Sequence, residues 1–169
     1  MVITAFLSPA PAIRADPLAA RFRTASAIID AVPANFDDFL RDAIARVAAV
    51  AAPLPDAYEE DAWIGVRWRI RQRTFAHVAP VDGRSPAFER AAGGPGPYVV
   101  MTFRSDGDEL DTLSRIGYPY FKPDWSPTVV GLHLTDESDW DEIAELVTES
   151  YCLLAPKKLA RLVARPPQD

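Results

Sequence analysis

Arginine occupies every second position of one short stretch, VRWRIRQR, at Arg67, Arg69, Arg71 and Arg73. Val66, Trp68 and Ile70 alternate with the arginines and are typical of a buried strand. Successive side chains of a strand point to opposite faces, so Arg67 and Arg69 are expected to face outward. Outward guanidinium groups can contact the phosphates of DNA, or their long stems can cover apolar surface while the charged heads remain in water. Both interpretations are open from these residues alone.

The distribution of charge along the chain bears on this choice. The formal net charge is −6, which discourages binding to nucleic acid. Residues 63–104, however, hold seven basic and two acidic groups, so a local basic patch can still attract phosphate. Residues 105–151 hold two basic and twelve acidic groups. This acidic block will repel DNA unless its helices lie on the far side of the sheet from the arginines.

Other residues capable of chemistry do not form a recognisable constellation. His77 and His133, the two histidines, lack the spacing of a metal site, and Cys152 has no evident base to activate it. The acidic runs at 106–111 and 136–142 fall at expected helix starts, where carboxylates meet the helix dipole favourably. We therefore expect no catalytic residue, no metal and no cofactor, and a protein that is not an enzyme. The aromatic stretch GYPYFKPDW is either the rim of a ligand pocket or the packing of a crossover connection.

Length and composition indicate one globular domain. The chain has 169 residues, and no run approaches the roughly 20 apolar residues that span a bilayer, so no membrane association is expected. A single cysteine fits a reducing compartment, and the cytoplasm is the default location. Residues 1–34, rich in Ala and Pro, are expected to form a disordered extension that can be removed without unfolding the domain. Residues 35–165 are expected to form the domain.

The expected elements begin with a helix over 36–52, capped by Asn35. AWIGVRWRI and TFAHV are expected strands joined tightly at Arg71-Gln72, with Trp68 and Phe75 as core residues. Residues 80–97 are expected to form a long mobile loop, because prolines and glycines dominate them.

The remaining pattern predicts three more strands and two helices. The strands are PYVVMTF, a short one around Phe121, and TVVGLHL. A short helix precedes Gly117, and the helix over 139–154 is capped by Asp139 with Glu142; a last helical stretch follows Pro156. The fold class is therefore α+β, with helices packed on an antiparallel sheet in the order α-β-β-β-α-β(β)-α.

Several stretches together resemble the MmcQ/YjbR family of small bacterial proteins. They are LPDAYEEDAW, WRIRQRTFAHV and DWDEIAELVTESYCLLAPKKLARLV, and the pairs that carry the resemblance are Leu54-Pro55, Glu59-Glu60, Phe75-Ala76, Ser150-Tyr151 and Lys157-Lys158. The resemblance covers about residues 36–164. It implies an α+β fold similar to frataxin-like and secretion-chaperone-like folds, a DNA-binding function and no catalytic residues. The chain departs from the family pattern in its first 34 residues, in the 80–97 stretch and in Arg71-Gln72-Arg73, where a glycine-containing turn is more usual.

These observations support three hypotheses. The first is a non-enzymatic DNA-binding module that uses Arg67, Arg69, Arg71 and Arg73, with Arg104 or Lys122 nearby. The second is a protein-interaction or chaperone-like module that binds an acidic protein partner. The third is a small-ligand binder around residues 118–125. The target sequence, the partner and the oligomeric state are not encoded in any pattern we identify.

Overall fold

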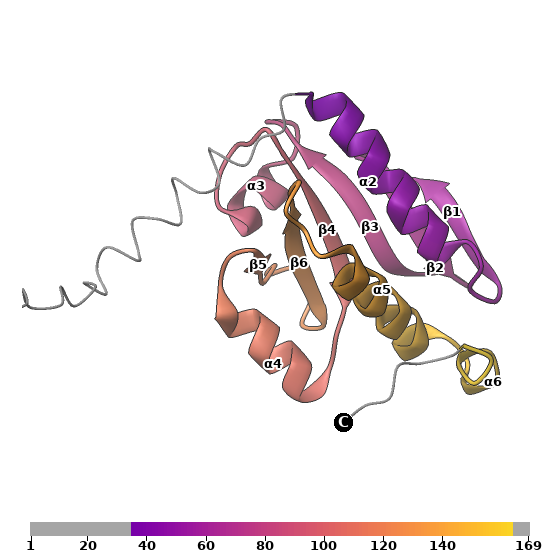
Figure 1. Cartoon of the computed structure of the whole chain (residues 1–169). Coiled ribbons are helices and arrows are strands. Elements are labelled where there is room, and N and C mark those ends of the chain that lie inside the picture. Colours follow the sequence, from indigo (N-terminus) through magenta and orange to yellow (C-terminus); the bar gives the residue numbers. More distant parts are fainter. Residues whose placement is uncertain (1–34, 164–169) are drawn as a thin grey trace, which may run out of the picture. The chain divides into compact units, whose positions relative to one another are not determined.

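The computed structural model describes residues 35–163, all of which lie in one compact unit. The expectations for residues 1–34 lie outside the described residues. The fold class predicted from the sequence is confirmed, since an open six-stranded antiparallel sheet carries helices packed against it (Figure 1).

The sheet has the strand order β1-β2-β3-β4-β6-β5, and every neighbouring pair is antiparallel. Chain neighbours are sheet neighbours up to β4, after which the short β5 takes the edge beyond β6. The strands are β1 (Ala57–Asp61), β2 (Val66–Ile70), β3 (Arg73–Val81), β4 (Tyr98–Arg104), β5 (Tyr120–Phe121) and β6 (Val129–Leu134).

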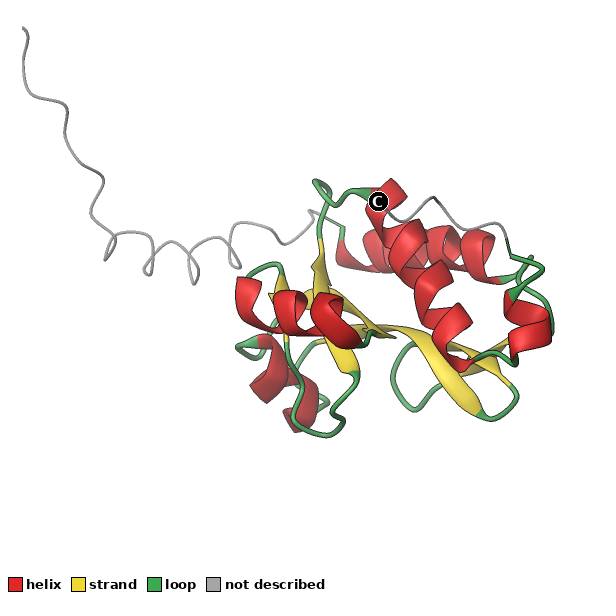
Figure 2. Ribbon diagram, turned by 90° about the horizontal axis from the view of Figure 1, so that it is seen from below, coloured by secondary structure: helices red, strands yellow, loops and turns green. Residues whose placement is uncertain are grey.

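Two helices, α2 (Phe36–Ala51) and α5 (Trp140–Leu154), lie side by side on one face of the sheet (Figures 1 and 2). Both begin at a side-chain cap, as expected. The Asn35 side chain accepts from the Asp38 amide, and the Asp139 carboxylate accepts from the amides of Asp141 and Glu142. Capping satisfies amides that have no partner inside the helix, which fixes where each helix starts.

The core lies between these helices and the sheet. Trp68 is 1% exposed and Phe75 is fully buried, on the adjacent strands β2 and β3, so the prediction that both are core residues is confirmed. Val47 of α2 and Val147 of α5 are buried in the same cluster. Each helix therefore buries one apolar face against the sheet.

The stretch 80–97 was wrongly expected to be a loop throughout. The strand β3 continues to Val81, and residues Pro86–Ala92 form the helix α3, which ends at Gly93 with a left-handed φ of 97°. Pro86 sits in the first turn, where proline is tolerated because the first amides of a helix have no internal partner. Proline and glycine here mark the start and end of a helix, not its absence.

A second error concerns the start of the sheet. AWIGVRWRI was expected to be one strand, but β2 begins at Val66, and residues 62–65 form a turn closed by the Ala62 amide and the Gly65 carbonyl. The preceding residues AYEED form β1, which was not predicted. The other helices are α4 (Gly107–Ile116), ending before Gly117 as expected, and α6 (Lys157–Ala160) after Pro156.

Candidate functional site

The hairpin of β2 and β3 places the four arginines in two different settings. Arg71 and Gln72 connect the strands, as expected, and Arg71 takes a left-handed φ of 56°, a conformation for which glycine is more usual. Arg67 and Arg69 lie in β2, whose other neighbour is β1. The position of β1 decides what the strand arginines can contact.

Glu60 of β1 binds both strand arginines. Its Oε2 lies 2.6 Å from Nε of Arg67 and 3.0 Å from Nη1 of Arg69. The hydrogen bond from Arg67 is the main cause that holds the pKa of the Glu60 carboxyl below its usual value. The Arg69 side chain is only 19% exposed. Arg67 and Arg69 lie on the face opposite the buried Trp68 and Ile70, as expected, but Glu60 of the neighbouring β1 pairs with both, so they are not free cations.

The tip of the hairpin remains free. Arg71 and Arg73 are exposed, and neither forms an ion pair with any residue from 35 to 163. The Arg71 carbonyl accepts a hydrogen bond from the Tyr58 hydroxyl at the start of β1. This contact fixes the backbone of the tip and leaves the guanidinium groups in solvent.

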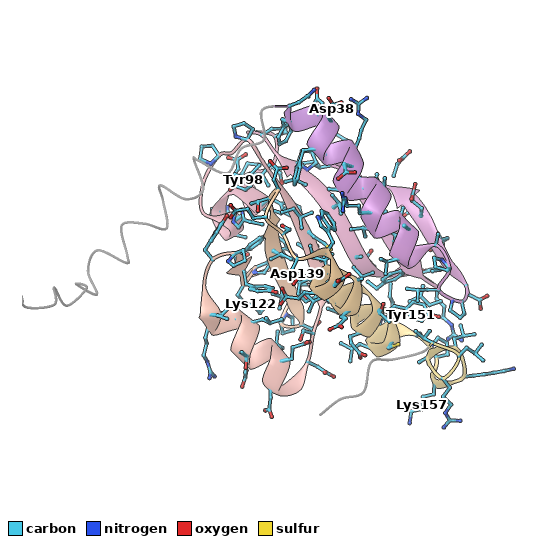
Figure 3. All side chains as sticks on the ribbon, in the orientation of Figure 1. Asp38, Tyr98, Lys122, Asp139, Tyr151 and Lys157 are labelled. Atoms are coloured by element: carbon cyan, nitrogen blue, oxygen red, sulfur yellow. The ribbon has the colours of Figure 1, made fainter. Side chains whose placement is uncertain are left out.

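The helix α6 adds further cations at the same end of the unit (Figure 1). Figure 3 shows Lys157 on α6, past the last turn of α5, and Lys158 and Arg161 are exposed as well. The Tyr151 hydroxyl of α5 donates to the Pro55 carbonyl over 2.6 Å, which ties this end of α5 to the segment that leads into β1. We call Arg71, Arg73, Lys157, Lys158 and Arg161 the cationic end.

Among residues 35–163, the carboxylate that pairs with Arg67 and Arg69 is Glu60 and not one of the acidic block. Asp111 of the block pairs instead with Arg115 of its own helix at 3.6 Å. The helix α5, which carries several of these acids, lies on the same face of the sheet as α2 (Figure 2). Arg67 is on the opposite face, in one cross-strand row with His77 of β3 and Thr102 of β4. The carboxylate that does neutralise strand arginines, Glu60, comes from outside the acidic block.

A cavity of about 240 Å³ opens on this opposite face. Arg67 of β2, His77 of β3, and Thr102 and Arg104 of β4 line it across three successive strands. Phe88 of α3 forms part of its wall. None of the lining residues carries a carboxylate, so the net charge of the cavity wall is positive.

Arg104 is held in this cavity by neutral groups. Its Nη1 donates to Ser126 Oγ and Thr128 Oγ1, both at 2.9 Å, and its Nε lies 3.5 Å from the Thr74 carbonyl. Burial, and then the repulsion of Arg73, lower the pKa of the Arg104 guanidinium from its usual value. An arginine stays protonated in proteins, so Arg104 is a half-buried positive charge without an anionic partner among the described residues.

His77 forms the floor of the cavity as a neutral side chain. Burial lowers the pKa of its imidazole, and its Nε2 lies 2.6 Å from the Ile64 carbonyl. A carbonyl only accepts, so Nε2 of the neutral ring carries the proton. The turn can approach this closely because Gly65, at φ 72°, has no Cβ; an added Cβ would lie 2.0 Å from the Val78 carbonyl oxygen.

The aromatic stretch 117–125 serves two purposes. Tyr118 and Phe121 pack on His133, both with ring centroids 5.4 Å from it, as the crossover interpretation requires. Trp125 instead lines the cavity and packs on Phe88 at 5.1 Å. The sequence indicated aromatic packing here, but it did not indicate Phe88, which fell in the stretch expected to be a loop.

In the part of the chain that the structure describes, no side chains are arranged as a metal site or around an activated nucleophile. Residues 35–163 contain no group of three or more His, Cys, Asp or Glu placed to hold a metal ion. Cys152 is a buried free thiol within the core cluster, and His133 is 5% exposed with Nε2 at 2.9 Å from the Ala92 carbonyl. Among the described helices, none is long and apolar enough to cross a membrane.

Comparison with known proteins agrees with the sequence pattern. The model of the YjbR family matches residues 52–153, more than half of the chain. This chain belongs to the YjbR family. The matched range begins just after α2, ends within α5, and includes every strand of the sheet and every residue that lines the cavity. The resemblance noted in the sequence is thereby confirmed.

A solved structure with a similar arrangement is the crystal structure of Deinococcus radiodurans protein DR2400, which carries the domain DUF419. It has 14% sequence identity to this YjbR-family chain and a TM-score of 0.48, and the match covers 73% of this chain and 88% of that one. A search of curated proteins found no match.

Proposed function

We propose that this YjbR-family protein is a non-enzymatic module that binds DNA through the phosphates, using the cationic end and not the β2 strand face. The observation that supports this proposal is the exposure of Arg71 and Arg73 with no ion pair among the described residues, whereas Arg67 and Arg69 share Glu60. An unpaired, solvated cation can replace a condensed counterion on DNA, and the release of that counterion favours binding.

The same geometry limits the expected affinity. Five exposed cations form the cationic end, but Asp56 lies in the segment next to Tyr151, and the whole chain carries a net charge of −6. Binding should therefore be weak, strongly dependent on salt and insensitive to sequence, because contacts to phosphate position a protein without reading bases.

The test is a titration of duplex DNA at several salt concentrations. We expect Arg71→Ala with Arg73→Ala to lower the log–log salt slope by about 1.8, from about 0.9 for each phosphate contact. The matched control is Arg41→Ala with Arg46→Ala, which removes the same charge from the exposed surface of α2. The variant Arg67→Ala with Arg69→Ala should change the slope little, because these cations are already paired.

Two outcomes would contradict the proposal. One is the absence of binding by the unaltered protein at low salt, to duplex and to single strands. The other is an equal loss of slope in the α2 control and in the hairpin-tip variant, which would mean that only overall charge matters.

Protein interaction is a second candidate function, and Trp63 favours it. This side chain is 97% exposed at the turn between β1 and β2, and exposed tryptophans are enriched at binding hot spots. An acidic protein partner would also compete for the cationic end. A protein that fails to bind DNA but binds a partner in a Trp63-dependent manner would support this second function.

A further inference from the structure

We propose that the cavity between the sheet and α3 binds a small organic molecule that carries one oxyanion group next to a flat apolar part. Neither Arg71 nor Arg73 lines this cavity, so the proposal goes beyond DNA binding and does not depend on it. Its evidence is the combination of an arginine without a carboxylate partner, a hydroxyl without a described partner and an aromatic wall around one open cavity.

Arg104 supplies the charge that the ligand would neutralise. Its three hydrogen-bond partners, Ser126, Thr128 and the Thr74 carbonyl, are neutral, and they leave its Nη2 without a partner among residues 35–163. A partly buried charge without a counter-charge is unfavourable, because burial removes water and nothing replaces it. An oxyanion from the ligand would supply that counter-charge by accepting a charge-assisted hydrogen bond from Nη2.

The charges and hydroxyl groups around Arg104 match a ligand with a single oxyanion group. Thr102 is 9% exposed, lines the cavity and has no described partner for its hydroxyl, so it can donate to the same oxyanion. The Nε of Arg67 donates to Glu60, whose carboxylate offsets part of the charge of Arg67 and is shared with Arg69. Burial lowers the pKa of His77, so its imidazole adds no positive charge at neutral pH. The wall therefore holds one cation without a carboxylate partner, Arg104, together with the threonines Thr74 and Thr102.

The wall away from Arg104 suits a flat apolar group. Phe88 and Trp125 pack at 60° with centroids 5.1 Å apart, and Phe88 meets the edge of His77 at 5.7 Å. Trp125 remains 43% exposed although it is large and apolar. A ring bound against this wall would cover part of that surface, with a gain typical of aromatic pairs.

The volume limits the size of the ligand. The cavity of about 240 Å³ corresponds to roughly eight water molecules and is smaller than the usual range for drug-sized ligands. A benzoate-sized molecule fits this volume, whereas a nucleotide is too large. The volume therefore suits a small ligand that carries one ring.

The experiment is a calorimetric titration of the full chain with four probes. Benzoate and phenyl phosphate carry both an oxyanion and a ring, benzyl alcohol carries only the ring, and inorganic phosphate carries only the oxyanion. We expect saturable binding of benzoate or phenyl phosphate, at least about tenfold tighter than either single-feature probe. The stronger of the two will show whether the site prefers a carboxylate or a phosphate.

Variants assign the binding to the cavity. Arg104→Gln should weaken the preferred probe by at least about tenfold, and Thr102→Val and Trp125→Ala by about two- to tenfold each. The matched control is Arg90→Gln, which removes the same charge from an exposed position of α3 outside the cavity wall. If Arg104→Gln does not fold, the other two variants decide the question, because Thr102→Val preserves shape and Trp125 is partly exposed.

The proposal is overturned if no ring-bearing anion binds saturably up to about 10 mM, or if benzyl alcohol binds as tightly as benzoate. It is also overturned if folded Thr102→Val and Trp125→Ala bind as the unaltered protein does. None of these results would alter the DNA test, whose variants are Arg71→Ala and Arg73→Ala.

Discussion

Phe75 connects the sheet to α5 through a single aromatic contact. Its ring is fully buried and meets Tyr151 edge to face, with centroids 5.4 Å apart at 82°. We expect Phe75→Ala to lower the free energy of unfolding by about 3–5 kcal/mol, because the substitution removes buried surface and leaves a cavity. Urea unfolding measures this. Trp63→Ala is the control, since that side chain is 97% exposed and its removal should change the free energy of unfolding little. A loss of less than about 1 kcal/mol in Phe75→Ala would contradict the packing of Phe75 against Tyr151.

Single residues could be predicted as buried or charged, but their partners could not. The alternation of Trp68 with arginines correctly indicated a strand with one buried face. Nothing in that alternation indicated Glu60, because the ion pairs form only once the turn at 62–65 brings β1 beside β2. The same holds for Arg104, whose neutral partners lie more than twenty positions away along the chain.

At the scale of elements, Ser150 joins α5 to two strands. Its hydroxyl donates to the Phe75 carbonyl over 2.5 Å and accepts from the Arg104 amide over 2.7 Å, and the side chain is fully buried. We expect Ser150→Ala to lower the free energy of unfolding by about 1–3 kcal/mol, because it leaves a buried carbonyl and a buried amide without partners.

Thermal or urea unfolding of Ser150→Ala checks this, with Thr148→Ala as the control. Thr148 lies on the same helix, but its hydroxyl donates only to the Ala144 carbonyl of that helix. Equal stability losses in the two variants would mean that the Ser150 hydrogen bonds do not hold α5 to the sheet.

Helices and strands with strong periodicity were predicted correctly, and the errors fall where local signals compete. The apolar stripe and caps of α2 and α5 were sufficient to identify them. AYEED lacks the apolar alternation of a strand, because β1 is an edge strand with two of its first three residues exposed. In α3, proline and glycine act at the helix ends, and a seven-residue helix offers too few turns to show a period.

At the scale of the whole molecule, the two faces of the sheet carry different kinds of residue. The face covered by α2 and α5 holds the continuous apolar core, whereas the opposite face carries Arg67, Arg69, Arg104, both histidines and the cavity. The order of strands could not be predicted in full, because the return of β5 to the edge beyond β6 depends on pairing between distant segments. The cavity could not be predicted either, since its wall combines β2, β3, β4, α3 and the 117–128 connection.

The whole chain contains two histidines, and both are expected to make stability depend on pH. Burial lowers the pKa of His77 and of His133 in the folded protein, whereas in the unfolded chain both should titrate near about 6.5. Below that pH the unfolded chain binds more protons than the folded one, so stability is fully present above about pH 6.5 and is lost as the pH falls. Each histidine can contribute at most about 1.4 kcal/mol for each pH unit in this window.

Urea unfolding between about pH 7 and pH 5.5 measures this slope, and the window stays above the range in which carboxylates such as Glu60 titrate. Proton NMR gives an independent check, because at the same pH both imidazoles should be less protonated in the folded protein than a free histidine is. Both rings donate from Nε2 to a backbone carbonyl, of Ile64 and of Ala92, and that arrangement also exists in the protonated form. The resistance to protonation must therefore come from burial, joined at His77 by the repulsion of Arg67. A constant free energy of unfolding across this window would contradict the burial of both rings.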